Sequence, residues 1–265
     1  MLYFPQLVSG ATVQYPFLKR RVQRTITNNL AGGNALKLLD PGWAKVEWEL
    51  TFETLNSEER SRLEEFFDAA GGRLNEFTFL DPTQNLFLQS EDLGASAWTK
   101  GPLVALNTGI ADPNGGMSAT RMSNTGSASQ RIQQTIEAPG CFCYCFSLYA
   151  RSEAAARVVL FRSTGGTEET TSYAIGASWV RLVLPGASQS EDESVGFGLS
   201  LEPGTAVDIY GLQAEAQPAP SMYRKTTSRC GVYSRARFDD DLLSITSYGP
   251  EQHSCTLRIV APMGS

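Results

Sequence analysis

Three cysteines at alternate positions are the first residues of this chain whose types could do chemistry. Cys141, Cys143 and Cys145 stand in the stretch CFCYCFSLYAR. Zinc sites usually place two thiolates two to four residues apart on a turn, so that both reach one ion. A spacing of two is instead the side-chain period of a β-strand, and free cysteine is a small, readily buried hydrophobe. We therefore expect a core strand here rather than a metal site, and no cofactor.

Histidine and carboxylates offer the other familiar catalytic groups. His253 is the single histidine, so a histidine-dependent triad has one candidate base. The Gly-x-Ser-x-Gly, phosphate-loop and HExxH motifs are absent. The glutamates of residues 58–65 fit a solvated helix surface, and a carboxylate pair is defined by its separation in space, which a sequence does not give. We expect no enzymatic activity and no catalytic residue, with a glycoside hydrolase kept as an alternative.

The elements that would position these groups are mostly strands. AKVEWELTFETL alternates, with Val46 and Trp48 among the residues of its apolar face. The next segment, LNSEERSRLEEFFDAAGG, predicts one helix, capped by Asn56 or Ser57 and ended by its two glycines. The hairpin around YGPEQ near the C-terminus must join an existing sheet, because an isolated hairpin is marginal in water.

Composition divides the chain into two domains. Residues 86–228 contain two lysines, are rich in Ser, Thr, Gly and Ala, and show repeated short strand patterns separated by turn signals. The predicted fold is mainly β: a β-sandwich domain with one α-helix from residues 1–85 and 229–265, and an inserted jelly-roll domain from residues 86–228. Insertion at an exposed turn is tolerated when the termini of the inserted module lie close together.

Charge and cysteine count exclude several classes. The net charge of -6 argues against a nucleic-acid binder, and five cysteines do not make a disulfide framework. The basic stretch LKRRVQR is expected to be a solvated strand face or a subunit contact rather than a phosphate site. We find no signal sequence and no apolar run of membrane-spanning length, so we expect no membrane insertion and no export by the usual signal route.

The opening and closing segments resemble phage distal tail and minor tail proteins. The resemblance rests on the stretch WELTFETLNSEERSRLEEFFDAAGGRLNEFTFLDP and on YSRARFDDDLLSITSY, which is similar to the strand that normally follows it. It implies a ring, usually a hexamer, between the tail tube and the tip or hub proteins. DNA would pass through this ring without specific binding. The protein would be part of the virion tail and be assembled in the cytoplasm of the bacterial host.

The middle segment is similar to jelly-roll, carbohydrate-binding-like modules inserted in many phage tail proteins. Four ordered stretches carry the resemblance: NLFLQSEDLGASAWTKG, CFCYCFSLYARS, SWVRLVL and VDIYGLQAEAQPAPSMYRKTT. It implies contact with a host-surface glycan, for which Tyr149, Tyr173, Tyr210 and Trp98 are the candidate residues. A tryptophan at such a motif position more often packs into the sandwich than against a sugar.

Two further interpretations stay open at this stage. The chain could be a glycan-binding adhesin or receptor-binding protein rather than a ring component. A calcium ion could also be held by oxygen ligands of the DPNGG or EDES loops, although neither is an EF-hand pattern.

Overall fold

A computed structural model describes residues 1–263 of the chain. The predicted fold class is confirmed, because this part of the chain contains sixteen strands and one helix, α1. No helix within residues 1–263 has the length and apolar character that crossing a membrane requires.

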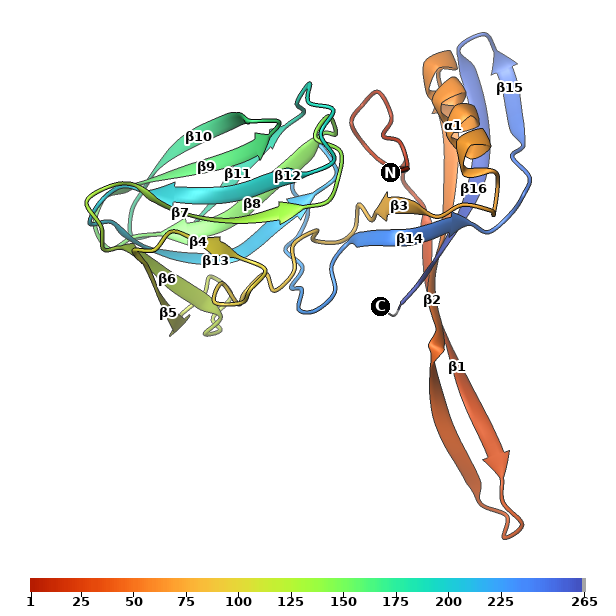
Figure 1. The fold of residues 1–265 in the computed structure, drawn as a ribbon, viewed down its shortest axis with the longest axis horizontal. Helices are drawn as coiled ribbons and strands as arrows, with labels where there is room; N and C mark the ends of the chain where they lie inside the picture. Colours follow the sequence, from red (N-terminus) through yellow and green to blue (C-terminus); the bar gives the residue numbers. More distant parts are fainter. Residues whose placement is uncertain (264–265) are drawn as a thin grey trace. The chain divides into compact units, whose positions relative to one another are not determined.

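The chain divides into two compact units (Figure 1). Unit 1 comprises residues 1–8, 12–79 and 233–265, and unit 2 comprises residues 9–11 and 80–232. The domain boundaries that we predicted, at 85/86 and 228/229, lie a few residues inside these limits. Segments from both ends of the chain therefore make one unit, and the middle of the chain makes the other.

The strands described in unit 1 form one sheet in the order β1-β2-β16-β14-β3, with β15 beside β16. This unit is therefore a single sheet, not the two-sheet sandwich that the sequence predicted for it. Their bounds are β1 Leu18–Asn29, β2 Ala35–Leu55, β3 Phe77–Leu80, β14 Val232–Phe238, β15 Ile245–Gly249 and β16 Gln252–Pro262. β16 pairs with β2 in antiparallel register from His253↔Leu55 to Pro262↔Lys45. This is the pairing predicted for the final hairpin, and it ties the two ends of the chain together.

The helix α1, Ser57–Ala70, covers one face of this sheet. Its first turn is closed by a reciprocal capping box, in which the Asn56 side chain accepts the Glu59 amide at 2.8 Å and the Glu59 carboxylate accepts the Asn56 amide at 3.2 Å. Gly71 ends the helix in the left-handed conformation, at φ 63°. The buried side of α1 rests on an aromatic core in which the Phe66 ring lies 5.1 Å from the Phe77 ring.

β2 begins nine residues before the strand that the sequence predicted, at Ala35 instead of Ala44. The added residues pair with β1 from Asn29↔Ala35 to Arg24↔Asp40, and the register then shifts across a bulge before Val22↔Lys45. β1 and the first part of β2 thus continue beyond the sheet as a two-stranded ribbon (Figure 1). We refer to residues 18–45 as the ribbon.

Unit 2 is a sandwich of two five-stranded sheets, ordered β10-β9-β12-β7-β4 and β11-β8-β13-β6-β5. The bounds are β4 Thr99–Lys100, β5 Val104–Ile110, β6 Ala119–Asn124, β7 Gln130–Ile136, β8 Tyr144–Arg151, β9 Ala156–Thr164, β10 Thr167–Ile175, β11 Val180–Gly186, β12 Val195–Leu201 and β13 Ala206–Glu215. Phe87, Tyr144 and Phe197 meet in the core between the sheets, with ring centroids 5.5 to 6.1 Å apart for the pairs that include Phe197. Period-two alternation therefore sends one set of side chains inward from each sheet.

The CFCYCF stretch lies at the start of β8. The strand begins at Tyr144, so Cys141 and Cys143 precede it, whereas Cys145 lies within it and is fully buried. The five cysteines are all free thiols, and no three His, Cys, Asp or Glu side chains of residues 1–263 gather as a metal site requires. Burial raises the pKa of Cys145 to about 12. The predicted core strand is therefore confirmed from Tyr144 onward, whereas Cys141 and Cys143 lie in the turn before it and Cys141 is exposed.

Candidate functional site

The outer face of the β11-β8-β13-β6-β5 sheet carries a row of three tyrosines. Tyr149 of β8 and Tyr210 of β13 are direct cross-strand partners, with ring centroids 6.2 Å apart. The Tyr223 ring follows 5.2 Å from that of Tyr210, in an edge-to-face arrangement. Tyr149 and Tyr223 are mostly buried but keep part of their surface accessible, whereas Tyr210 is 8% exposed. We call these three residues the tyrosine row.

Arginines lie against the aromatic rings at the Tyr149 end of this row. The guanidinium of Arg181 lies over Tyr149, 5.5 Å from its centroid, and that of Arg151 lies 4.9 Å from the Trp179 ring. Arg181 donates from Nη2 to the Ser147 hydroxyl at 3.0 Å. Its Nε is buried and has no hydrogen-bond partner among residues 1–263. The face thus combines neighbouring aromatic rings with arginine guanidinium groups.

A buried carboxylate holds two of the arginines of this face in place. Asp208 Oδ1 accepts from Arg121 Nε at 2.7 Å, and Asp208 Oδ2 accepts from Arg151 Nε at 3.1 Å. The Asp208 side chain is 2% exposed. Burial alone would raise the pKa of Asp208, but the hydrogen bonds from Arg121 and Arg151 outweigh it and lower the pKa below its ordinary value. The two guanidinium groups are therefore fixed by a charged partner.

The segment that follows β13 folds back over the same face and brings Tyr223 to the row. Glu215 accepts the Ser221 amide at 3.0 Å, and the Gln213 side-chain oxygen accepts the Arg224 amide at 2.7 Å. Gly211, at φ 67°, lies under the Tyr223 ring, where a Cβ atom would approach within 3.2 Å. A glycine is thus required at this position both by the backbone and by the ring.

A polar hollow of about 310 Å³ lies beside the tyrosine row. Tyr223 reaches it by donating its hydroxyl to Glu91 Oε1 at 3.3 Å, and Glu91 Oε2 is paired with Lys225 at 2.5 Å. The hollow is lined by charged and hydroxyl-bearing side chains from four segments, among them Glu91, Asp92, Thr108, Thr120, Lys225 and Thr227. Such a combination of an aromatic platform and hydrogen-bonding groups is suited to a hydroxyl-rich ligand.

The four residues predicted for glycan contact are not brought together. Tyr149 and Tyr210 lie side by side in the tyrosine row. Tyr173 belongs to β10 in the other sheet, and its hydroxyl donates to the Val183 carbonyl. Trp98 is 4% exposed, its ring packs 5.1 Å from Phe87, and its Nε1 donates to the Gln89 carbonyl at 3.0 Å. A core position with its polar atom satisfied leaves Trp98 no open ring face, so we leave it out of the site.

Sequence reasoning missed Tyr223 and the arginines of this face. Two signals were present, because Trp179 and Arg181 stand in SWVRLVL and Tyr223 stands in SMYRKTT. Both stretches carry the resemblance to jelly-roll modules, and that resemblance does not assign them a ligand-binding role. Their convergence on one face depends on strand pairing and on the returning segment, neither of which is local in sequence.

The His253 imidazole of unit 1 forms hydrogen bonds with the adjacent turn. Its Nδ1 lies 2.8 Å from the Ser247 hydroxyl, and its Nε2 lies 3.1 Å from the Pro250 carbonyl. The ring is 2% exposed. Ser57 donates its hydroxyl to the same Pro250 carbonyl at 2.6 Å, and its oxygen lies 3.5 Å from His253 Nε2.

Asp112 of the DPNGG loop likewise closes its own turn. Its carboxylate accepts the backbone amides of Asn114, Gly116 and Ser118 at 2.8, 3.1 and 3.1 Å. These bonds lower its pKa against the opposing effect of burial. The Asp112 carboxylate thus holds the loop by accepting hydrogen bonds from backbone amides, as in an Asx turn.

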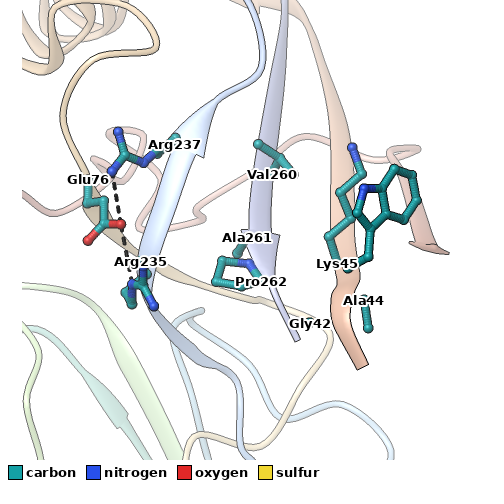
Figure 2. A pocket seen from close by; sticks show the side chains of 10 residues that line it. Gly42, Ala44, Lys45, Glu76, Arg235, Arg237, Val260, Ala261 and Pro262 are labelled. Atoms are coloured by element: carbon teal, nitrogen blue, oxygen red, sulfur yellow. Dashed lines mark hydrogen bonds and ion pairs between the residues drawn. The ribbon is translucent and has the colours of Figure 1, made fainter. Parts of the chain in front are cut away.

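A second hollow, of about 360 Å³, lies in unit 1 at the base of the ribbon. Figure 2 shows Glu76 between Arg235 and Arg237, whose guanidiniums donate to it at 3.3 and 3.0 Å. The hydrogen bond from Arg237 is the largest influence on Glu76 and lowers its pKa. These charges satisfy one another, so the unit 2 face is the stronger candidate for ligand binding.

No protein-family model matches the chain, and no curated protein matches it. Solved structures do match about half of it. One is TmCBM61 in complex with β-1,4-galactotriose, at 16% identity over 50% of this chain and 98% of that chain, with a TM-score of 0.41. Another is the C-terminal family 22 carbohydrate-binding module of Clostridium thermocellum Xyn10B, at 15% identity over 53% of this chain and 99% of that chain, with a TM-score of 0.42.

A third match is the enzymatically active domain of bacteriophage CBA120 tailspike protein 4. It is 15% identical over 52% of this chain and 22% of that chain, with a TM-score of 0.38. These are similarities of fold, to jelly-roll modules in two cases and to a tailspike domain in the third. The resemblance of unit 1 to distal tail proteins, and the absence of enzymatic activity, stay predictions.

Proposed function

We propose that the chain is a structural protein of a phage tail whose unit 2 binds a glycan of the host cell surface. The observation that carries the glycan part is the tyrosine row with its flanking arginines, next to the 310 Å³ polar hollow. Accessible parts of aromatic rings stack on the apolar faces of sugar rings, and arginine, carboxylate and threonine side chains bind the hydroxyls.

Unit 1 is the assembling part in this proposal, and it forms an oligomeric ring at the distal end of the tail tube. Support comes from the ribbon, whose leucine and isoleucine side chains are exposed to solvent in a monomer. An exposed apolar surface on a two-stranded hairpin is stabilised by a protein neighbour. In such a ring the partners are other copies of the chain, the tail tube and the tip or hub proteins.

Two measurements on the full-length protein test the two parts separately. The first is binding to an array of bacterial surface polysaccharides, together with β-1,4-galactotriose and xylohexaose as defined probes, followed by calorimetry on any ligand found. We expect saturable binding that Arg181→Ala weakens and Arg157→Ala leaves unchanged, because Arg157 lies on the other sheet. A folded protein that binds none of these glycans would overturn the glycan part.

The second measurement is the mass of the protein in solution as a function of concentration, with negative-stain images of the largest species. We expect closed rings of defined size. A protein that stays monomeric at every concentration, and that does not join purified tail tubes, would overturn the ring part. Glycan binding by such a monomer would instead favour a separate adhesin or receptor-binding protein, and release of reducing sugar would favour a glycoside hydrolase.

A further inference from the structure

The tyrosine row leads to the polar hollow at the edge of its sheet. Arg181, Tyr149 and Tyr210 are successive cross-strand neighbours on β11, β8 and β13, so the row runs across the strands. β6 and then β5 follow β13 in this sheet, and β5 is the last strand in the order. Residues from the end of β5 and from the start of β6 line the hollow. A chain of sugars that follows the row therefore ends its path there.

Two hydrogen-bonded walls give the polar hollow its shape. Residues 89–92 and 225–227 form one wall, in which the Gln89 amide donates to the Thr227 carbonyl at 2.9 Å. The antiparallel pair β5–β6 forms the other wall and contributes Thr108. Because main-chain hydrogen bonds hold both walls, the hollow exists before a ligand arrives, and less entropy is lost on binding.

Gln89 has a strained backbone conformation at this hollow. Its φ is 49°, and within residues 1–263 every other residue with a positive φ is a glycine. The Gln89 carbonyl accepts the indole N–H of Trp98 at 3.0 Å, so a buried tryptophan of the core holds the strained residue in place. Residues in such conformations gather at binding sites, where the surrounding structure maintains them. The strain thus marks Gln89 as a residue of the site.

Three uncharged side chains of the hollow have hydrogen-bonding groups to offer a ligand. Gln89, Thr108 and Thr227 line the hollow, and within residues 1–263 none of their side chains forms a hydrogen bond. The amide and the two hydroxyls can each donate and accept. Sugar hydroxyls do the same, so these groups match a sugar residue without any charge on it.

The charged groups at the hollow are anionic in sum and already have partners. Glu91 is paired with Lys225, and this pairing raises the pKa of the lysine. Asp92 accepts a backbone amide at 3.1 Å, and Asp112 accepts the amide of Ser118, a lining residue, at 3.1 Å. Three carboxylates thus stand beside one ammonium group. A sugar that carries a carboxylate or a phosphate would be repelled here, whereas an uncharged sugar would not.

We propose that the polar hollow holds the terminal residue of the glycan, that this residue is an uncharged sugar, and that the rest of the glycan leaves along the tyrosine row. This inference rests on the proposed glycan binding and specifies the substrate class. Chains that end in an uncharged sugar are bound, and chains whose ends all carry a carboxylate or a phosphate are not.

The first test counts protein molecules on each chain. A linear polysaccharide found on the array is separated into a short and a long fraction, and each fraction is titrated into the full-length protein by calorimetry. We expect the same number of protein molecules per chain in both fractions, because each chain has one end of the recognised kind. A number that rises in proportion to chain length would show binding along the chain and would overturn the inference.

The array itself tests the charge of the terminal residue. We expect every bound glycan to have at least one chain end that is an uncharged sugar. A glycan that is bound although all its chain ends carry a carboxylate or a phosphate would overturn the inference.

Variants of the hollow separate a binding role from a structural one. We expect Gln89→Gly and Thr108→Val each to lower the affinity at least fivefold. The melting temperature of Gln89→Gly should be unchanged or raised, since glycine adopts a φ of 49° at no steric cost. Thr170→Val is the matched control and should bind like the wild type, because Thr170 is also an exposed threonine of an edge strand, β10 of the other sheet.

The remaining outcomes distinguish this inference from the proposed function. Binding that Tyr149→Ala loses, but that Gln89→Gly and Thr108→Val keep, would overturn the inference and leave the proposed glycan binding standing. Equal losses in Thr108→Val and Thr170→Val would also overturn it, because the hollow would then have no special role. A folded protein that binds no glycan on the array would overturn the proposed glycan binding and this inference with it.

Discussion

The guanidinium of Arg181 lies over the Tyr149 ring, 5.5 Å from the ring centroid, on the outer face of the β8–β11 pair. The two residues are direct cross-strand partners, so the strand register alone brings the charge over the ring. The Tyr149 ring also neighbours the Tyr210 ring, with centroids 6.2 Å apart. Tyr149 is therefore held in a fixed orientation, which reduces the entropy lost when a ligand stacks on it.

Removal of the Tyr149 ring should weaken glycan binding. We expect Tyr149→Ala to lower the affinity at least tenfold, about 1.4 kcal/mol, because the stacking platform and the support for Arg181 are lost together. Tyr149→Phe should stay within about threefold of the wild type, since it keeps the ring. Calorimetry with the ligand identified on the array measures both. Equal affinities for Tyr149→Ala and the wild type would exclude this face as the binding site.

Asp208 should contribute to the stability of unit 2 in a pH-dependent way. We expect Asp208→Asn to lower the free energy of unfolding by about 2 to 3 kcal/mol at pH 7, because two arginines lose a buried charged partner. This expected loss of unfolding free energy is smaller than that for a fully buried ion triad, because the Arg121 and Arg151 side chains are 33% and 30% exposed. Denaturant melts followed by near-ultraviolet circular dichroism measure it.

The sign of the pH effect follows from the lowered pKa of Asp208. A carboxyl group with a lower pKa in the folded state adds stability above its unfolded pKa, and this stability is lost as the pH falls through the folded value. The difference between wild type and Asp208→Asn should thus be full at pH 7 and shrink below about pH 4. A difference that grew on acidification would contradict the charged assignment of Asp208.

Gly198 in the middle of β12 should not tolerate a side chain. A Cβ atom there would lie 2.1 Å from the Ile132 carbonyl oxygen and 2.7 Å from the Phe161 ring. The nearer contact is with the backbone of the neighbouring strand β7, so the clash can be relieved only if the sheet moves. We therefore expect Gly198→Ala to lower the free energy of unfolding by about 3 kcal/mol. Gly176→Ala is the matched control, since a Cβ atom at Gly176 meets nothing within 4 Å. Similar melting temperatures for the two variants would contradict this packing.

Sequence reasoning succeeded where the determinants are local. The helix α1 carries its own cap, its apolar stripe and its terminal glycines, so its bounds could be read directly from residues 56–72. The alternation in β2 identified Val46, Trp48, Leu50 and Phe52 as core residues, and all four are buried. In a half-buried strand the buried residues recur at every second position, so the alternation in the sequence identifies them.

The ribbon could not be predicted in the same way. ALKLLDPG contains consecutive leucines and a Pro-Gly pair, which gives neither clean alternation nor a turn that closes a hairpin. These residues are in a strand because β1 pairs with them, and their side chains are exposed because the pairing extends past the rest of the sheet. Such an arrangement depends on contacts beyond the local pattern.

The sequence named only part of the candidate site, because the remaining residues reach it through contacts that are not local in sequence. Tyr149 and Tyr210 could be named because both lie at alternate positions of strong strand patterns. Tyr223 joins them only through a left-handed Gly211, a register shift in β13 and the side chains that hold the returning segment. Trp98 shows the opposite case, because a motif tryptophan whose indole N–H finds a backbone carbonyl is satisfied in the core.

The free cysteines should differ in reactivity according to their burial. Cys141 is exposed, whereas burial raises the pKa of Cys145 to about 12 and that of Cys255 to about 11. The thiolate is the reactive form, so iodoacetamide at pH 8 should label Cys141 of the native protein first. Cys145 and Cys255 should react only at the rate of unfolding, at least a hundredfold more slowly, and mass spectrometry of peptides resolves the sites. In urea all five should react alike, and rapid native labelling of Cys145 would show that β8 is not a covered core strand.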